Sequence, residues 1–581
     1  MVLKNIVLKK SILLLTGFLI SLGGFAQESR TFLNPILAGY YPDPSITRVG
    51  EDYYLIHSTF AYFPGVPIFH SKDLVNWRQI GHVLDRAEQL DVDGLGITRG
   101  IFAPAISHHK GTFYMITTLV DKGGNFVVTA TDPAGPWSNP VWLSDVNGID
   151  PSIFFDDDDR AYIVYNSEAP DNKPLYDGHR TIRMLEFDYK NLKTTGPQTI
   201  LVNGGVDISK KPVWIEGPHV YKKGDYYYLM AAEGGTSVNH SEVILRSKNI
   251  RGEYVPYAEN PILTQRHLSP DRPFPVSATG HADLVETQNG EWWAVFLATR
   301  PYDKEDHYNI GRETFLAPVR WVGGWPIINP DYEEVQYAYP IPKLPASAAS
   351  AVPLNGNFTY RDNFDTESLP LHWSFARTPR TQWYSLAEPA GSLTVALRPE
   401  TLSGTRNPSF VARRQQHWTG SASTKMQFNP AAANEFAGMA LFQGEQNYYA
   451  FGKTLNAAGE PVVQLLKSIK APAAGGDGAT EVVAEQKLSP RERNKPLFLK
   501  YVFDKGTLSF HYATKEGDWK LLQEGVDGTF LSTRVAGGFV GTTVGPYATS
   551  QAKPSNAKAS YDWFEYQGND AVYESKEILF K

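Results

Sequence analysis

Cysteine is absent from the chain, and this absence narrows its chemistry before any motif is considered. Thiol nucleophiles, cysteine-ligated zinc, iron–sulfur clusters, disulfides and a lipid anchor on an N-terminal cysteine are all excluded. Any metal must be held by oxygen or histidine ligands, so a structural or axial calcium ion is compatible with the sequence. We expect that no cofactor is required.

The chain also lacks an excess of positive charge and, beyond its first residues, long apolar runs. Lysine and arginine number 55 against 62 aspartates and glutamates, which gives a formal net charge of −7. Without a long basic run, binding to nucleic acid or to an anionic membrane is not expected. After residue 26 no stretch reaches the ~18 apolar residues of a membrane-spanning helix, so no membrane insertion is expected.

Aromatic residues, by contrast, are abundant. They make up 13% of the chain and include 31 tyrosines and 13 tryptophans, within a hydrophobic share of 42%. This composition supports more than one globular core, and it favours β-rich structure and, more weakly, surfaces that stack against sugars.

The N-terminus carries the pattern of a targeting segment. Three lysines precede an apolar stretch of 14 residues, 12–25, and the small residues Gly24 and Ala26 occupy positions −3 and −1 of a cleavage site. Fourteen residues rise only ~21 Å as a helix, short of a ~30 Å hydrocarbon core, which favours a signal peptide over a membrane anchor. We therefore predict that residues 1–26 are removed, that the mature chain begins at Gln27, and that the protein is exported to the periplasm or beyond.

One sequence phrase recurs through the first part of the chain: a key residue, a proline or small residue, an apolar segment, a turn, and a segment rich in aromatic side chains. A period of this size, filled with short β segments and Gly/Asp turns, is typical of a β-propeller, whereas a β-sandwich would not repeat one hairpin five times. The sequence therefore predicts a five-bladed β-propeller over residues 27–340. The key residues are Asp43, Ala103, Asp150, Glu216 and His281, at spacings of 60, 47, 66 and 65.

Equivalent positions in a propeller lie at equivalent radius and height, so the five key residues should meet at one end of the central axis. Gathering three acids and a histidine there opposes folding, because like charges repel and buried charges lose solvation. Turn formation explains a single Asp-Pro pair, but not an acid at the same repeat position three times. The pattern predicts a catalytic site.

Five phrases around these positions resemble glycoside hydrolase family 43, which contains β-xylosidases and α-L-arabinofuranosidases on a five-bladed propeller. Residues 358–570 resemble the β-sandwich appended to one branch of that family, notably at 361–364 and 383–386. The five phrases are Tyr41-Pro42-Asp43-Pro44-Ser45-Ile46, Ile149-Asp150-Pro151-Ser152, Trp214-Ile215-Glu216-Gly217-Pro218-His219, Gly280-His281-Ala282-Asp283-Leu284 and Gly311-Arg312-Glu313-Thr314.

The resemblance implies a role for each acid. Asp43 matches the family's general base, Glu216 its general acid, and Asp150 the residue that tunes and orients the acid. Because the family inverts configuration, a water must fit between base and sugar, and the two carboxyl groups should lie ~6.5–9.5 Å apart. Asp43 must be ionised and Glu216 protonated, and an ionised Asp150 nearby would raise the pKa of Glu216.

The resemblance further places Phe60, Phe102, Thr236, His281 and Arg312 around the sugar. His281 has two other interpretations, an indirect ligand of an axial ion and a hydrogen-bonded core histidine. Arg312 could instead form a surface salt bridge, and Thr236 could stabilise a turn. Phe102 departs from the tryptophan that related β-xylosidases usually carry before Ala-Pro. The acidic run 156–159 lacks the pattern of an EF-hand and is interpreted as a solvated β-turn.

The rest of the chain predicts a linker and a second domain. Residues 341–357 are rich in proline, alanine and serine without periodicity, which is typical of a linker. Strict alternation of apolar and polar residues at 393–397 and 508–512 predicts antiparallel strands of a β-sandwich over residues 358–581, and the resemblance implies that this sandwich is concanavalin-like. Its role stays open between building the rim of the pocket and binding carbohydrate by itself.

Together these features predict an exo-acting, inverting glycosidase that releases terminal α-L-arabinofuranose from plant hemicellulose or its oligosaccharides. A β-D-xylosidase acting on xylo-oligosaccharides is the alternative, and Phe102 in place of tryptophan favours the arabinofuranosidase. A non-catalytic carbohydrate-binding protein is disfavoured because all three acids are present. Exo action needs a pocket closed behind the sugar, and we expect the loop 60–64 and an edge of the sandwich to close it.

Overall fold

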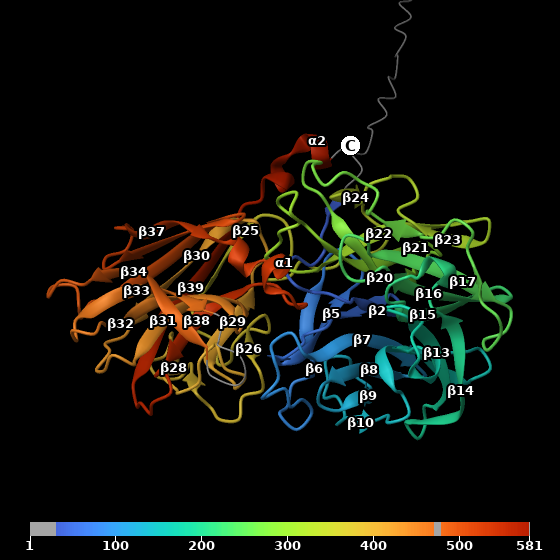
Figure 1. The fold of residues 1–581 in the computed structure, drawn as a ribbon, viewed down its shortest axis with the longest axis horizontal. Coiled ribbons are helices and arrows are strands. Elements are labelled where there is room, and N and C mark those ends of the chain that lie inside the picture. Colours follow the sequence, from blue (N-terminus) through green and yellow to red (C-terminus); the bar gives the residue numbers. More distant parts are fainter. Residues whose placement is uncertain (1–30, 470–477, 580–581) are drawn as a thin grey trace, which may run out of the picture.

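Short antiparallel hairpins build two β bodies that lie side by side in the computed structural model (Figure 1). The structure describes residues 31–469 and 478–579, so the predicted signal peptide, residues 1–26, and Gln27 lie outside the described residues. No helix in the described ranges combines the length and apolarity needed to cross a membrane.

The first body consists of five separate antiparallel sheets, each built from consecutive strands of the chain. Glycine at positive φ, such as Gly224 (59°) and Gly290 (78°), makes the tight turn between the first two strands of a blade. The first three blades comprise β2 (Ser45–Val49), β3 (Asp52–Ile56), β5 (Gly65–Ser71) and β6 (Arg78–Leu84); β7 (Gly100–His109), β8 (Thr112–Val120), β9 (Gly124–Ala130) and β10 (Val141–Trp142); and β11 (Gly148–Phe155), β12 (Ala161–Glu168), β13 (Arg180–Asp188) and β14 (Lys193–Asn203). The last two comprise β15 (Glu216–Lys223), β16 (Tyr226–Glu233), β17 (Ser241–Ser247), β18 (Val255–Pro256) and β19 (Leu263–Thr264); and β20 (Ser277–Glu286), β21 (Trp292–Thr299), β22 (Glu313–Val322) and β23 (Trp325–Ile328).

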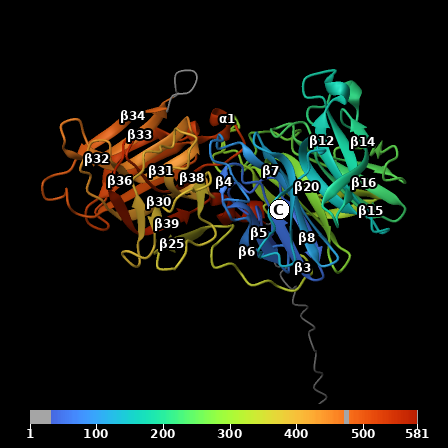
Figure 2. The same ribbon diagram turned by 90° about the horizontal axis from the view of Figure 1, so that it is seen from below.

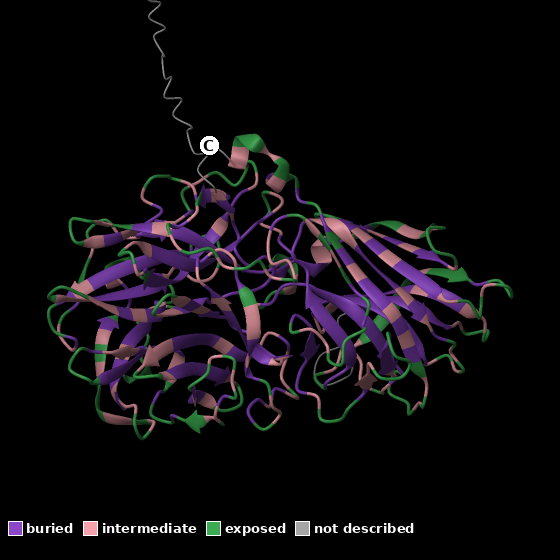
Figure 3. Cartoon of the chain, turned by 180° about the vertical axis from the view of Figure 1, so that it is seen from behind, coloured by how far each residue is buried: buried purple, intermediate pink, exposed green. Residues whose placement is uncertain are grey.

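The first strand of each blade lies innermost, and these strands form a closed ring. Strand β2 contacts β7 and β20, β11 contacts β7 and β15, and β15 contacts β20. The five-bladed propeller predicted from the repeat is therefore confirmed. Buried residues, purple in Figure 3, run along these inner strands, while the turns between strands are mostly exposed.

The N-terminal segment ties the last blade to the first. Strand β1 (Thr31–Leu33) pairs with β24 (Ala338–Pro340), which follows blade 5. The side chain of Asn34 donates to the carbonyl of Leu316 and accepts from its amide, at 2.9 and 3.0 Å. Leu37 then forms a β-bridge with Thr314. These contacts lay the segment along β22 before it enters blade 1.

The second body is a sandwich of two antiparallel sheets around one apolar core. The first sheet comprises β25 (Phe358–Asp362), β27 (Tyr384–Ser385), β28 (Leu393–Ala396), β39 (Lys558–Gly568), β30 (Thr419–Gln427), β35 (Leu497–Asp504), β36 (Thr507–Ala513) and β37 (Lys520–Asp527). The second comprises β34 (Ala479–Lys487), β33 (Pro461–Ile469), β32 (Asn447–Leu455), β31 (Phe436–Gly444), β38 (Thr543–Thr549), β29 (Ser409–Arg414), β26 (Ser374–Ala376) and β4 (Tyr62–Phe63). The helices are short: α1 (Thr533–Ala536), α2 (Lys576–Leu579), and the 3-10 turns η1 (Pro170–Asn172), η2 (Ile208–Lys210), η3 (Thr529–Leu531) and η4 (Ala571–Glu574).

Strand β4 belongs to the propeller in sequence but to the sandwich in space. It leaves the loop after β3, and Phe63 pairs with Phe375 and Tyr62 with Ala376 of β26. In Figure 2 it lies between the two bodies. The hydroxyls of Tyr62 and Thr543 are 2.9 Å apart, and an apolar cluster of both bodies surrounds them. The loop 60–64 is thus fixed from both sides.

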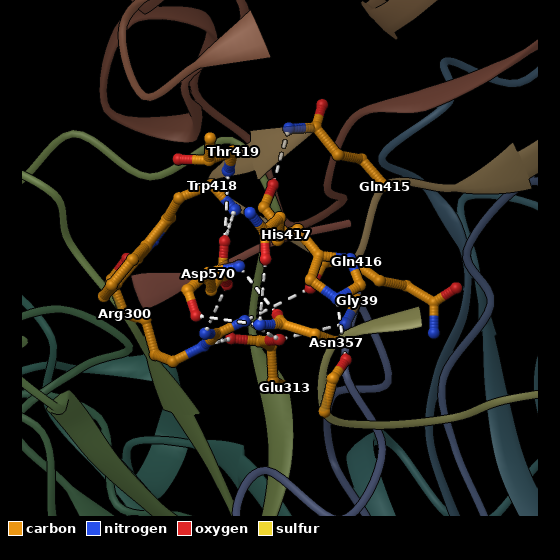
Figure 4. A network of polar contacts seen from close by, with 12 residues as sticks. Gly39, Arg300, Glu313, Asn357, Gln415, Gln416, His417, Trp418, Thr419 and Asp570 are labelled. Carbon is orange, nitrogen blue, oxygen red and sulfur yellow. Dashed lines mark hydrogen bonds and ion pairs between the residues drawn. The ribbon is translucent and has the colours of Figure 1, made fainter. Parts of the chain in front are cut away.

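A buried polar network forms a second joint (Figure 4). The guanidinium of Arg300 contacts Glu313 at 2.5 Å within the propeller and Asp570 of the C-terminal segment at 3.0 Å, and all three side chains have no exposed surface. Asp570 accepts from the amide of Trp418 at 2.7 Å. Beyond it, η4 and α2 leave the sandwich, and Val572 packs into the propeller core. The last described residues therefore return to the first body.

Candidate active site

The key residue of four blades lies where the pairing of the innermost strand with its neighbour is interrupted. Such bulges add an unpaired residue, bend the strand and re-aim a side chain. In blade 1 the corresponding Asp43 precedes β2, which begins at Ser45. The four interruptions fall between Phe102 and Ala105, Ile149 and Ser152, Glu216 and His219, and Gly280 and Asp283.

Three of the key residues also have a left-handed backbone. The φ angles of Asp43, Asp150 and His281 are 53°, 54° and 51°. Such angles are uncommon outside glycine, although aspartate and histidine adopt them several times more often than most residues. Residues held in sparsely populated backbone regions cluster at functional sites. The repeat thus produces the same local strain in three different blades.

These side chains meet in a cavity of about 580 Å³ on the propeller axis. Asp43, Asp150, His281 and Arg312 are each less than 9% exposed, so the charged groups lie at its buried end. Every residue predicted for the site lines this cavity, namely Asp43, Phe60, Phe102, Asp150, Glu216, Thr236, His281 and Arg312. Sequence reasoning missed Arg99, Val120, Ile149, Glu168, Arg180, Trp214, Gly235 and Phe539.

Asp43 is held as a carboxylate. Its oxygens accept from Arg312 at 3.0 Å and from the hydroxyl of Ser58 at 2.6 Å, and His281 lies 3.6 Å away. Burial acts to raise the pKa of Asp43, but the charge of Arg312, together with His281 and Ser58, outweighs it. The pKa therefore falls below its usual value, and the interpretation of Arg312 as a surface salt bridge is wrong.

The pKa values of Glu216 and Asp150 are shifted in the opposite direction, upward. Burial raises the pKa of Glu216 well above its usual value, and repulsion from Asp150 and then Asp43 adds to the effect. Burial, followed by repulsion from Asp43, also raises the pKa of Asp150, to about 7. Asp150 is therefore only partly ionised at neutral pH, because it is as buried as its neighbours. Burial and repulsion from neighbouring carboxylates thus favour the protonated form of both carboxyl groups.

The other predicted polar residues, His281 and Thr236, lie beside the groups that surround the acids. A Cβ on Gly217 would come within 2.7 Å of His281 Nε2, so the imidazole lies directly against the residue that follows Glu216. Burial lowers the pKa of His281 to about 4, which leaves the ring neutral at pH 7. The hydroxyl of Thr236 accepts from Arg312 at 3.2 Å. It therefore helps to hold the guanidinium that pairs with Asp43.

Three phenylalanines from different parts of the chain form one wall. The ring centroids of Phe60 and Phe102, and of Phe102 and Phe539, are each 5.5 Å apart in edge-to-face contact. Phe539 comes from the sandwich, between α1 and β38. The guanidinium of Arg312 lies 5.5 Å from the Phe539 centroid. Phe60, from the loop 60–64, and Phe539, from the sandwich, both line the pocket. That this loop and an edge of the sandwich close the pocket stays a prediction.

A metal centre is not evident in residues 31–469 and 478–579, where no three His, Asp or Glu side chains are grouped to hold an ion. The acidic run 156–159 forms a turn, as interpreted, but Asp156 is buried rather than solvated. Its carboxylate accepts from Lys222 at 2.6 Å and from Tyr227 at 2.7 Å, so protein groups satisfy it.

Comparisons with known proteins match both bodies. The family model for glycosyl hydrolases family 43 covers residues 32–326, and the model for the β-xylosidase C-terminal concanavalin A-like domain covers 361–567. The chain is 40% identical to a xylosidase/arabinosidase of Butyrivibrio fibrisolvens, over 91% of this chain and 98% of that protein. It is 38% identical to a non-reducing end α-L-arabinofuranosidase of Bacteroides ovatus, over 96% and 98%.

A solved structure supports the same relationship. The structure described as Bacteroides ovatus xyloglucan PUL GH43B superposes with a TM-score of 0.82 at 38% identity, covering 93% of this chain and all of that one. The likeness therefore extends through both bodies and their joint.

Proposed function

Because this chain belongs to glycosyl hydrolase family 43, we propose that it is an inverting, exo-acting enzyme that releases terminal α-L-arabinofuranose from plant hemicellulose or its oligosaccharides. The observation that carries the proposal is the contrast between two carboxyl groups in one pocket. The pKa of Asp43 is lowered and that of Glu216 is raised, which is the pairing that base and acid require.

In the proposed reaction Asp43 takes a proton from a water molecule while the oxygen of that water attacks the anomeric carbon. The bond from that carbon to the leaving oxygen breaks, and Glu216 gives its proton to that oxygen. The attack comes from the face opposite the leaving group, so the released sugar has the inverted anomeric configuration. Asp43 ends protonated and Glu216 ionised, and exchange with solvent restores both.

Asp150 supports the acid without touching the water. Burial already raises the pKa of Glu216, and Asp150 in its ionised form raises it further by charge repulsion, which keeps the proton on Glu216 until the leaving oxygen takes it. The reaction uses two carboxyl groups and water, so we propose that no cofactor takes part in it. A bound calcium ion would have a structural role.

The phenylalanine wall supports the proposal of exo action. Phe60, Phe102 and Phe539 close one side of the cavity, which suits the terminal residue of a chain rather than its interior. Arabinose is favoured over xylose by Phe102 and by the similarity to the arabinofuranosidase of Bacteroides ovatus. The Butyrivibrio fibrisolvens relative, whose name carries both activities, supports β-D-xylosidase as the second candidate.

Two measurements test the proposal. Rates on nitrophenyl α-L-arabinofuranoside and nitrophenyl β-D-xylopyranoside, compared side by side, should favour the first. Proton NMR of a fresh digest should show the released pentose first as the anomer opposite to that of the bond cleaved, with no mid-chain fragments. Release of the retained anomer would require a covalent intermediate, with carboxyl groups only ~5–5.5 Å apart, and would overturn the role given to Asp43.

We also propose that the protein is exported, from the pattern of residues 1–26. Mass spectrometry of the protein purified from its native host should find an N-terminus at or within a few residues of Gln27. An extracytoplasmic protein that retained Met1 would contradict this.

A further inference from the structure

The pocket has a buried end and an exposed end, and the two differ in chemistry. Asp43 is 6% exposed, whereas Trp214, on the same cavity, is 36% exposed. Trp214 stands two residues before Glu216, the group proposed to protonate the leaving oxygen. The part of the substrate that departs must therefore lie beside Glu216 and toward the exposed end, which is where the indole is.

The backbone holds Trp214 in a fixed and strained position. Its φ is 50°, a left-handed value that is a clear outlier for a bulky residue. Its amide donates to the carbonyl of Gly178 at 2.9 Å, and the carbonyl of Val213 accepts from Gly234 at 2.8 Å. Two loops from different blades thus pin the segment. Strain of this kind persists only where the surroundings over-determine it.

The side chain of Trp214 is supported on one face. The guanidinium of Arg180 lies 4.5 Å from its ring centroid and is itself ion-paired with Glu168. Arg180 donates to the side chain of Asn166 at 2.8 Å, and Asn166 donates to the carbonyl of Ile215 at 2.8 Å. The supported indole is therefore connected through hydrogen bonds to the residue between it and Glu216.

We propose that Trp214 is the platform on which the leaving sugar stacks, that is, the ring to which the terminal pentose is attached. This proposal rests on the proposed function. An aromatic face backed by a fixed cation suits the apolar face of a sugar ring, and pre-organisation lowers the entropic cost of binding it. Binding energy from this ring, remote from the reacting carbon, is then available to the transition state.

The charges of the pocket define the class of sugar. Each arginine that lines the cavity, within the described part of the chain, already pairs with a carboxylate: Arg99 with Asp121, Arg180 with Glu168, and Arg312 with Asp43. A uronic acid would need a cation that is not already committed. The leaving ring is therefore a neutral sugar.

The test compares substrates that share the terminal pentose but differ in the leaving group. For Trp214→Ala, kcat/KM on an arabinose-substituted xylo-oligosaccharide and on xylobiose should fall about tenfold or more. On the matching methyl pentosides, which place nothing on the platform, it should change less than about threefold. Trp214→Phe should recover most of the loss. Trp142→Ala, which removes an exposed tryptophan from β10, is the matched control and should behave as the wild type.

A binding measurement tests the same proposal without depending on turnover. In the background of Asp43→Asn, titration calorimetry with the same oligosaccharides should show Kd about tenfold higher when Trp214→Ala is added. Equal losses on oligosaccharides and methyl pentosides, or an unchanged Kd, would overturn the platform. A wild-type protein inactive on every pentoside would instead overturn the proposed function, while the calorimetry still decides the role of Trp214.

Discussion

Arg312 contacts both the proposed base and Phe539, the residue that the sandwich contributes to the wall. It pairs with Asp43 at 3.0 Å, and its guanidinium lies over the rings of Phe539 and Phe60. A cation enclosed by aromatic rings acts strongly on its partner, because little water screens it. The ionisation of Asp43 should therefore depend on this arginine more than on any other neighbour.

Removing that charge should move the acidic limb of the pH profile. Activity needs ionised Asp43, so it is lost as pH falls through the pKa of Asp43. In Arg312→Met the largest effect that offsets burial is removed, and only weaker effects, chiefly those of His281 and Ser58, remain. The pKa of Asp43 should rise, so the acidic limb of kcat/KM should shift to higher pH. Arg312→Lys keeps the charge and should shift the limb less. An acidic limb that stays in place in Arg312→Met would contradict the assignment of Asp43 as base.

The loss of activity on removing the acid Glu216 should be larger for leaving groups that need protonation in order to depart. Glu216→Gln should lower kcat on oligosaccharides ~10²-fold or more, because positioned proton transfer contributes ~10²–10⁴-fold. Nitrophenyl pentosides should lose much less, since nitrophenolate leaves without protonation. Asp43→Asn should impair both substrate classes alike, so steady-state rates on the two classes separate the acid from the base.

The residues that sequence predicted and those that it missed differ in a physical way. Asp43, Asp150, Glu216 and His281 recur at one position of a repeat, so their convergence follows from symmetry. Phe539 obeys no such repeat, because it reaches the pocket from the other body. Arg180, Glu168 and Trp214 lie on loops and strand ends, where nothing in local sequence indicates which side chains turn inward.

At the scale of elements, the hairpins were predictable and their junctions were not. Alternation and glycine turns indicated strands at 393–397 and 508–512, which the structure contains as β28 and β36. The loop 60–64 gave no strand signal, yet Tyr62 and Phe63 form β4 at the edge of the sandwich sheet. Edge pairing between distant segments depends on the docking of the two bodies, which no local pattern encodes.

The segment between α1 and β38 should contribute to substrate binding through one side chain. Phe539→Ala opens the wall beside Arg312, and its backbone amide can still donate to Thr98, as it does at 2.7 Å. We expect kcat/KM on terminal pentosides to fall about tenfold or more, with little change in melting temperature. Val535→Ala, at an exposed position of α1, is the control. An unchanged KM and kcat for Phe539→Ala would show that the sandwich only supports the propeller.

At the scale of the whole molecule, the network around Arg300 should hold the two bodies together. Arg300→Met leaves Glu313 and Asp570 buried without their counter-charge, and removing one partner of a buried pair typically costs about 3–5 kcal/mol. Urea unfolding should report this loss. Arg320→Met breaks an exposed pair with Asp331 and should cost at most about 1 kcal/mol. Equal losses in the two variants would contradict the role of the network.

The return of residues 571–579 to the propeller also sets an order of events during synthesis. The strands of the propeller are complete once residue 340 has left the ribosome, but Phe539 and Asp570 come some 200 residues later. At about 5–20 residues per second, roughly 10–50 s separate the two moments. During that interval the nascent propeller lacks Phe539, which completes the wall of its pocket, and Asp570, whose carboxylate pairs with Arg300. Catalytic competence is therefore acquired only when nearly the whole chain has been made.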